Sequence, residues 1–217
     1  MNDAGDRPDR AGLFQLATEQ RGYFTTAQAR DYGYSRSLLA HHAKTGTFQR
    51  VHTGIYRFRD YPSTPREELA AAWLAVGKDV AVVSHESALE QWDLGDLIPE
   101  TVHLSVPRTR RRLPCLPGVT IHTTTRPLDR ENVQMLEGIP VTTPARTLLD
   151  VAQANVAPDQ LGFALYQAIT RGWIDRDALR VQAARRGPRV ARIIDGALLG
   201  SCQRMRACPA SRASLRA

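Results

Sequence analysis

The chain has 217 residues, of which 42% are apolar and 24% are charged, as in an ordinary folded protein rather than a disordered one. Its 29 Lys and Arg residues exceed its 22 Asp and Glu residues, for a net charge of +7. It contains no uninterrupted apolar run of about 18 residues, so we expect no membrane span. The polar start lacks the apolar core of a secretory signal, and three scattered cysteines do not suggest a disulfide framework. We therefore expect a cytoplasmic protein.

The excess positive charge is uneven along the chain. Residues 1–60 hold 9 basic and 6 acidic residues, residues 61–160 hold 9 and 13, and residues 161–217 hold 11 and 3. This pattern of a basic head, an acidic middle and a basic tail suggests separable parts with different partners. Basic composition alone is a weak indication of nucleic-acid binding, because it does not specify a site.

The first sixty residues have the pattern of a helix-turn-helix. After a polar start at 1–10, predicted to be disordered, a first short helix is expected over 11–20. Thr25 followed three residues later by Gln28 resembles a capping box and predicts a second helix. A turn containing glycine leads to Ser35, which can cap a third helix extending to about residue 44. Two short helices joined by such a turn are typical of DNA-binding domains.

The third helix is the candidate recognition helix, whose N-terminal residues would reach base edges in the major groove. Leu39 and Ala43 are expected to face inward. Arg36 could contact guanine or phosphate, and His41 and Lys44 are expected to contact phosphates. The residues predicted to face DNA from the second and third helices are Thr25, Thr26, Ser35, Arg36, Ser37, Ala40, His41 and Lys44.

Residues 47–58 contain two β-rich runs around a Thr-Gly pair, which predicts a hairpin. A hairpin directly after a helix-turn-helix is a wing. Its exposed polar positions, suited to contact with the DNA backbone or minor groove, are predicted to be Arg50, His52, Thr53 and Arg57.

The order of these elements resembles the N-terminal winged helix of AbiEi-family antitoxins. The resemblance is carried by Gly-Tyr-Phe-Thr-Thr-Ala-Gln-Ala, then Gly-Tyr-Ser-Arg, then Arg-Val-His-Thr-Gly-Ile-Tyr-Arg. The last run is the most specific, since the wing turn in that family is also followed by an aliphatic residue and tyrosine. Two alternatives stay open: winged helices can be protein-interaction modules, and similar short helices with a hairpin occur in folds that bind no DNA.

Beyond a linker at 61–65, strands alternate with helices, which predicts a mixed α/β domain over 66–185. Ser84 is expected to cap one of its helices, and Thr64 and Pro65 to begin another. The stretches Ser-His-Glu-Ser-Ala-Leu and Ile-Pro-Val-Thr-Thr-Pro-Ala-Arg-Thr-Leu-Leu-Asp extend the AbiEi resemblance to about residue 185. The last segment, 186–217, is predicted to be a flexible basic tail, too short for the nuclease domain that follows in some related chains.

No motif supports catalysis or cofactor binding. Ser84, His85 and Glu86 are adjacent in sequence, and three neighbouring residues at a helix start point in different directions, unlike a catalytic triad. No Cys or His spacing suits a metal, and no glycine-rich phosphate loop is present. We therefore predict no enzyme activity, no cofactor and no metal.

The basic loop at 107–114 could contact a phosphate backbone. An equal alternative is a solvated loop, or a loop that pairs with the acidic middle of the chain. Its arginines are Arg108, Arg110, Arg111 and Arg112.

The expected fold is α+β: a winged helix-turn-helix, a mixed α/β domain with short strands and several helices, and a flexible basic tail. The resemblance implies a DNA-binding transcriptional regulator and antitoxin. It would repress its own toxin–antitoxin operon by binding double-stranded promoter DNA. It would also counteract a nucleotidyltransferase-type toxin without requiring a stable complex. Two alternatives are a stand-alone winged-helix transcription factor with a ligand- or partner-sensing domain, and a catalytically dead relative of nuclease-fused proteins.

Overall fold

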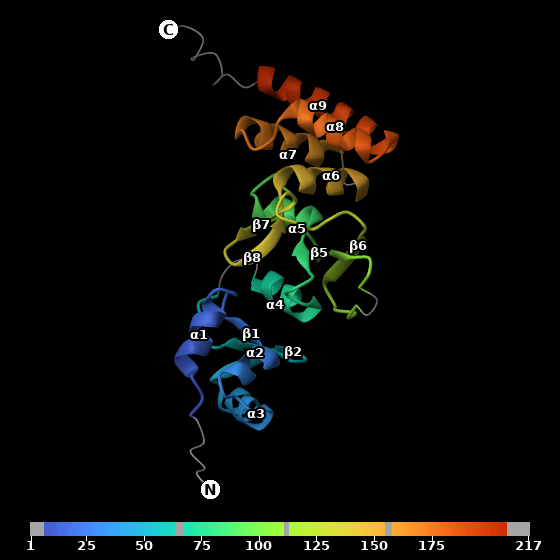
Figure 1. Cartoon of the computed structure of the whole chain (residues 1–217). Helices are drawn as coiled ribbons and strands as arrows, with labels where there is room; N and C mark the ends of the chain where they lie inside the picture. The colour runs from blue at the N-terminus through green and yellow to red at the C-terminus, as the bar shows by residue number, and fades with distance from the viewer. Residues whose placement is uncertain (1–6, 64–66, 111–112, 155–157, 208–217) are drawn as a thin grey trace.

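The computed structural model describes residues 7–63, 67–110, 113–154 and 158–207. These residues form three stacked layers (Figure 1): a winged helix at one end, a five-stranded sheet in the middle and a set of helices at the other end. The predicted disordered start falls mostly outside the described residues. Arg10 nevertheless already belongs to the first helix, because the Asp9 side chain caps it by accepting from Gly12 N at 2.9 Å.

The first layer contains a three-stranded antiparallel sheet and three helices. Its elements are α1 (Arg10–Thr18), β1 (Tyr23–Thr25), α2 (Thr26–Asp31), α3 (Arg36–Thr45), β2 (Phe48–His52) and β3 (Ile55–Phe58). The strand order is β1-β3-β2. The short strand β1 was not predicted, because it has three residues and the last of them, Thr25, is also the N-cap of α2. Aromatic rings fill this layer: Phe24 lies 5.0 Å from Phe48 between ring centroids, and both are fully buried.

The helix caps predicted for the winged helix, at Thr25 and Ser35, are present. Thr25 Oγ1 accepts from Gln28 N at 3.0 Å, and Gln28 Oε1 accepts from Thr25 N at 2.8 Å, so the capping box is complete. Ser35 Oγ accepts from Leu38 N at 3.1 Å and begins α3. Gly46 ends α3 in the left-handed conformation, with φ of 87°.

The second layer is a mixed sheet with the strand order β6-β5-β4-β8-β7. Its strands are β4 (Val82–Val83), β5 (Val102–Pro107), β6 (Val119–Thr124), β7 (Val133–Leu136) and β8 (Ile139–Thr142). β5 runs parallel to β6, and β4 runs parallel to β8, while the β4–β5 and β7–β8 pairs are antiparallel. The edge strand β7 was not predicted, because its four residues, of which only Gln134 is polar, give no clear apolar alternation.

Helices cover this sheet from two sides. α4 (Glu67–Val76) packs between the winged helix and the sheet, with Leu69 and Trp73 buried in the sheet's core. The predicted start of this helix at Thr64 and Pro65 lies outside the described residues. α5 (His85–Gln91) and α6 (Pro144–Ala154) lie on the side toward the third layer, as Figure 1 shows.

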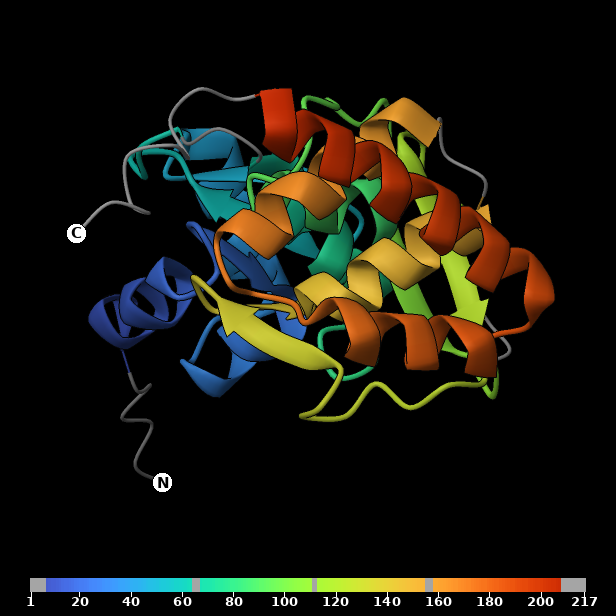
Figure 2. The same ribbon diagram turned by 90° about the horizontal axis from the view of Figure 1, so that it is seen from above.

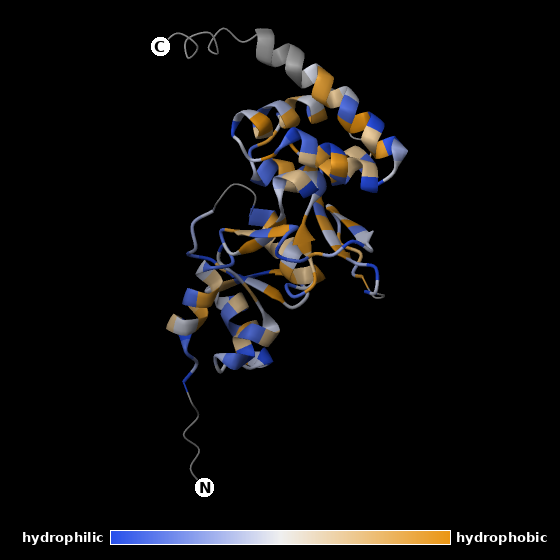
Figure 3. Ribbon diagram, turned by 45° about the horizontal axis from the view of Figure 1, so that its top comes forward, coloured by the Kyte–Doolittle hydropathy of each residue, from blue (hydrophilic) through white to orange (hydrophobic). Residues whose placement is uncertain are grey.

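The third layer corrects the prediction of a flexible tail. Besides α6 it contains α7 (Pro158–Thr170), α8 (Arg176–Arg185) and α9 (Pro188–Ala207), and Figure 2 shows α9 lying across the outer side of this layer. Val190, Ile194 and Leu198 recur every four residues and are buried against the other helices. Hydrophobic and hydrophilic residues accordingly alternate along the described part of α9 (Figure 3). The high arginine content of this segment masked its apolar stripe, and residues 208–217 lie outside the described part.

The winged helix shares its sheet with the second layer. Tyr23 and Ile55 belong to the core under α4, whereas Phe24 and Tyr56 on the same strands belong to the core of the winged helix. A sheet that is buried on both faces holds the two layers together over a continuous apolar contact. The boundary at 61–65 therefore separates the sequence into two parts, but the two hydrophobic cores meet across one sheet.

Candidate functional site

α3 presents a continuous polar face to solvent. Leu39 is fully buried and anchors the helix, while the predicted outward residues are all exposed: Ser35, Arg36, Ser37, Ala40, His41 and Lys44. In Figure 1, α3 lies at the end of the molecule farthest from the helical layer. The described elements therefore leave this face of the helix uncovered.

The wing lies beside this face. Arg50 and Thr53 are exposed, and His52 is partly exposed at a bulge in the β2–β3 pairing. Thr26 ties the wing turn to α2, because its backbone N and its Oγ1 donate to the carbonyl oxygen of Gly54 at 2.8 and 3.2 Å. Thr25 and Thr26 thus have local structural roles, and their predicted contact with DNA stays a prediction.

Arg57 is not an exposed wing residue, contrary to the prediction. Its side chain is 7% exposed and forms an ion pair with Glu67 of α4 at 3.0 Å. It also donates to the carbonyl oxygens of Tyr61 and Pro62 at 3.0 Å. The strand is buried on both faces, so its alternating pattern did not indicate which side meets solvent. Arg57 joins the winged helix to the second layer and is removed from the candidate DNA surface.

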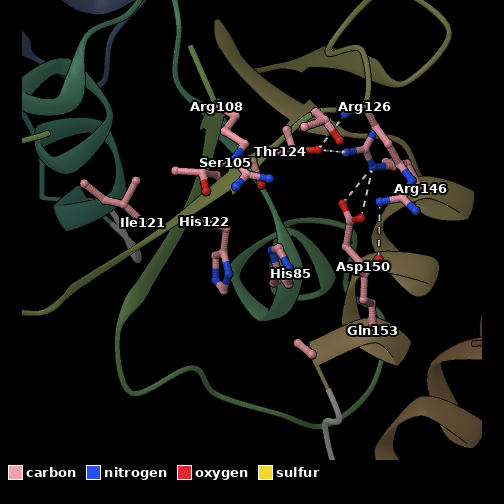
Figure 4. Close-up of a pocket in the computed structure, with 13 residues that line it drawn as sticks. His85, Ser105, Arg108, Ile121, His122, Thr124, Arg126, Arg146, Asp150 and Gln153 are labelled. Carbon is pink, nitrogen blue, oxygen red and sulfur yellow. Dashed lines mark hydrogen bonds and ion pairs between the residues drawn. The ribbon is translucent and has the colours of Figure 1, made fainter. Parts of the chain in front are cut away.

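The predicted arginine loop is only partly described. Arg108 and Arg110 are exposed at the end of β5, and Arg111 and Arg112 lie outside the described residues. Arg108 lies at the edge of a pocket in the second layer, among residues of β6 and α6 (Figure 4). Its surroundings therefore belong to the sheet rather than to the α3 surface.

Ser84, His85 and Glu86 do not form a triad. Ser84 is fully buried, and its hydroxyl accepts from Ser105 Oγ at 2.8 Å and lies 2.9 Å from His85 Nδ1. These contacts replace the predicted cap, since the Ser84 side chain makes no capping hydrogen bond to α5. Glu86 instead faces His103, with Oε2 and Nε2 3.7 Å apart.

Three histidines from separate elements gather beside Ser84, and the sequence did not reveal this. The imidazoles of His85 and His122 stack with centroids 3.6 Å apart, and His103 Nδ1 lies 3.0 Å from His122 Nε2. Burial lowers the pKa of His85 to about 3 and that of His122 to about 4, and it also lowers the pKa of His103. All three rings are therefore neutral near pH 7, and each can both donate and accept a hydrogen bond.

A buried ionic group lies next to these rings. Arg146 Nε donates to both carboxylate oxygens of Asp150, at 3.1 and 2.8 Å, and Arg186 donates to the same carboxylate. The three side chains are 4–7% exposed. Arg146 and Asp150 are four residues apart on α6, a spacing visible in the sequence. Arg186, predicted to lie in a flexible tail, is held here as the C-cap residue of α8.

The described part of the chain offers neither a metal site nor a membrane-spanning helix. There, no three or more His, Cys, Asp and Glu side chains are grouped in a way that could hold a metal ion. None of the helices in that part has the length and apolarity needed to cross a lipid bilayer.

The geometry and the family matches agree on a class of protein. Residues 13–59 match the family described as "Transcriptional regulator, AbiEi antitoxin", so the winged helix is the regulator domain of a DNA-binding transcriptional regulator. Residues 80–201 match the "AbiEi antitoxin C-terminal domain". The second match alone spans more than half of the chain, and the chain belongs to the AbiEi antitoxin family.

One solved structure supports the fold. The RV2827C protein from Mycobacterium tuberculosis superposes with a TM-score of 0.61, over 88% of this chain and 76% of that chain, at 14% sequence identity. This likeness concerns the fold alone. No curated protein matches the chain significantly. The resemblance noted from the sequence is confirmed, and the second domain extends beyond residue 185, since both the family match and α9 continue past it.

Proposed function

We propose that this protein represses its own toxin–antitoxin operon by placing α3 in the major groove of operator DNA. The observation that carries the proposal is the unobstructed polar face of α3 next to an exposed wing. Arg36 is the first residue of α3, the position from which a recognition helix reaches base edges. Lys44, on the last turn, would contact a phosphate, and Arg50 on the wing would contact the adjacent backbone.

The test is binding of the full chain to a fluorescent duplex that carries its own promoter. Arg36→Ala should weaken binding about fivefold or more and relax base preference, since a bidentate arginine–guanine contact contributes about 1–3 kcal/mol. Arg50→Ala should weaken binding to all duplexes alike. It should also reduce the slope of log binding constant against log salt concentration by about 1. Arg192→Ala is the matched control, because it removes an equally exposed positive charge on α9, far from α3. Parent-like binding by Arg36→Ala and Arg50→Ala would exclude this docking.

We further propose that the protein counteracts a nucleotidyltransferase-type toxin through its second domain, without a stable complex. Family membership supports this, and the full burial of Ser84 argues against its hydroxyl acting as a nucleophile. Cells arrested by a nucleotidyltransferase toxin encoded next to this gene should grow again when this protein is co-expressed. Arg36→Ala should restore growth as well as the parent does. If neither the parent nor Arg36→Ala restores growth while the parent still binds promoter DNA, a stand-alone transcription factor is favoured instead. Cleavage of DNA in the presence of Mg²⁺ would contradict the non-catalytic proposal.

A further inference from the structure

The second domain contains a pocket of about 510 Å³ that the DNA-binding proposal does not use. It opens at the carboxyl ends of the parallel strands β5 and β6 and is closed by α5 and α6 (Figure 4). Ligands of open α/β sheets bind at this end of the strands, and the volume is in the range of small-molecule sites. The place and the size of the pocket both suit a small ligand.

The charge of the pocket is positive. Arg108, Arg126 and Arg146 line it, and Asp150 is its one acidic lining residue. Asp150 is already shared by Arg146 and Arg186. Within the described ranges no carboxylate lies within ion-pair distance of Arg108 or Arg126. Arg126 Nη1 donates to the Gln153 side-chain oxygen at 3.4 Å, a neutral partner that leaves the arginine charge unbalanced. The two guanidinium charges therefore match a ligand with two negative charges.

Neutral hydrogen-bond donors complete the lining. Thr124 Oγ1 accepts from Arg126 N at 3.0 Å and from Arg146 Nη2 at 3.3 Å, which directs its own hydroxyl proton toward a third group. His85 and His122 add ring nitrogens, and their lowered pKa values keep the rings neutral near pH 7. Guanidinium and hydroxyl donors around one cavity are the groups that bind phosphate oxygens.

His85 also has an unfavourable backbone conformation, with φ of 53°. A non-glycine residue in the left-handed region persists only where its surroundings fix it, and such residues concentrate at ligand sites. Here the stacked His122 ring and the contact to Ser84 fix the His85 ring at the wall of the pocket. The strained residue and the unneutralised arginines therefore occur at the same place.

We propose that this pocket binds a phosphorylated small molecule, with its phosphate held by Arg108, Arg126 and the hydroxyl of Thr124. A phosphate monoester carries nearly two negative charges at neutral pH, which matches the two unneutralised arginines. A carboxylate has one charge and would leave one guanidinium unmatched. The proposal does not depend on whether α3 binds DNA.

The test is calorimetric titration of the full chain with inorganic phosphate, adenosine monophosphate, adenosine triphosphate and unphosphorylated adenosine. At least one phosphorylated compound should bind, and adenosine should bind at least tenfold more weakly than its monophosphate. Binding of inorganic phosphate as tight as that of the nucleotides would assign the site to free phosphate. Tighter binding of the nucleotides would assign it to a phosphorylated metabolite.

Variants identify the pocket as the site of binding. Arg126→Ala and Arg108→Ala should each weaken binding about tenfold or more, the loss expected when a charge-assisted hydrogen bond is removed. Arg130→Ala is the control, since Arg130 is exposed nearby and does not line the pocket. Thermal melting checks that each variant folds. The proposal is overturned if no phosphorylated compound binds, or if Arg130→Ala weakens binding as much as Arg126→Ala.

Discussion

Asp150 provides the sharpest test of how the second domain is held together. Its carboxylate faces two guanidinium groups, with Arg146 Nε at 2.8 Å from one oxygen and Arg186 on the other. All three side chains are at least nine-tenths buried. Asp150→Ala leaves two buried cations without a counter-ion, which we expect to lower the free energy of unfolding by about 3–5 kcal/mol. Asp150→Asn keeps one carbonyl acceptor and should fall between this variant and the parent.

Urea unfolding followed by tryptophan fluorescence measures this loss. The chain's three tryptophans, Trp73, Trp92 and Trp173, all lie in the second domain, so the signal reports that domain. Asp177→Ala is the control, since it removes a carboxylate that is 88% exposed and paired with one arginine. Surface pairs of this kind contribute about 1 kcal/mol or less. Equal losses in Asp150→Ala and Asp177→Ala would refute the reasoning from burial.

Two further predictions concern acid and the contact between layers. Because folding lowers the pKa of His85 and His122 below the usual 6.5, the unfolded chain binds more protons below that pH, and stability falls as the pH drops toward about 4. Unfolding at pH 5 should cost about 2 kcal/mol less per histidine than at pH 7, and equal urea midpoints would contradict this. Gly138→Ala should destabilise by about 2 kcal/mol or more, since a Cβ there would lie 2.0 Å from the Glu19 carbonyl oxygen. Gly118→Ala has the same left-handed backbone with nothing within 4 Å, so a loss as large in that variant would show that the clash contributes nothing.

Local signals in the sequence located the winged helix well. The Thr25–Gln28 box and the Ser35 cap depend on residues three apart, so their geometry follows from the chain itself. The Thr-Gly turn located the wing for the same reason. The family resemblance rests on this local pattern. The winged helix and the family could therefore both be recognised from one sequence.

The polar cluster of the second domain could not be found in this way. His122 lies opposite Ser105 only because β5 and β6 pair in parallel, a register that no local pattern states. His85 comes from a third element, and Arg186 reaches Asp150 because it caps α8 where that helix ends near α6, a contact between residues 36 positions apart. The prediction that Arg57 is exposed was wrong for a related reason. When both faces of a strand are buried, the sequence pattern does not indicate which side chains meet solvent.

The small sheet β1-β3-β2 has a consequence for how this protein can be divided. Its strands contribute Phe24 and Tyr56 to one core and Tyr23 and Ile55 to the other, so cutting the chain after the wing would expose an apolar wall. A DNA-binding fragment prepared in this way would be prone to self-association, and it would lack the Glu67 partner of Arg57. Adding α4 would cover that wall, but the other side of α4 is buried against the five-stranded sheet, so a fragment ending at residue 76 would expose a new apolar surface. The DNA-binding part is therefore best moved to another protein together with the whole second domain.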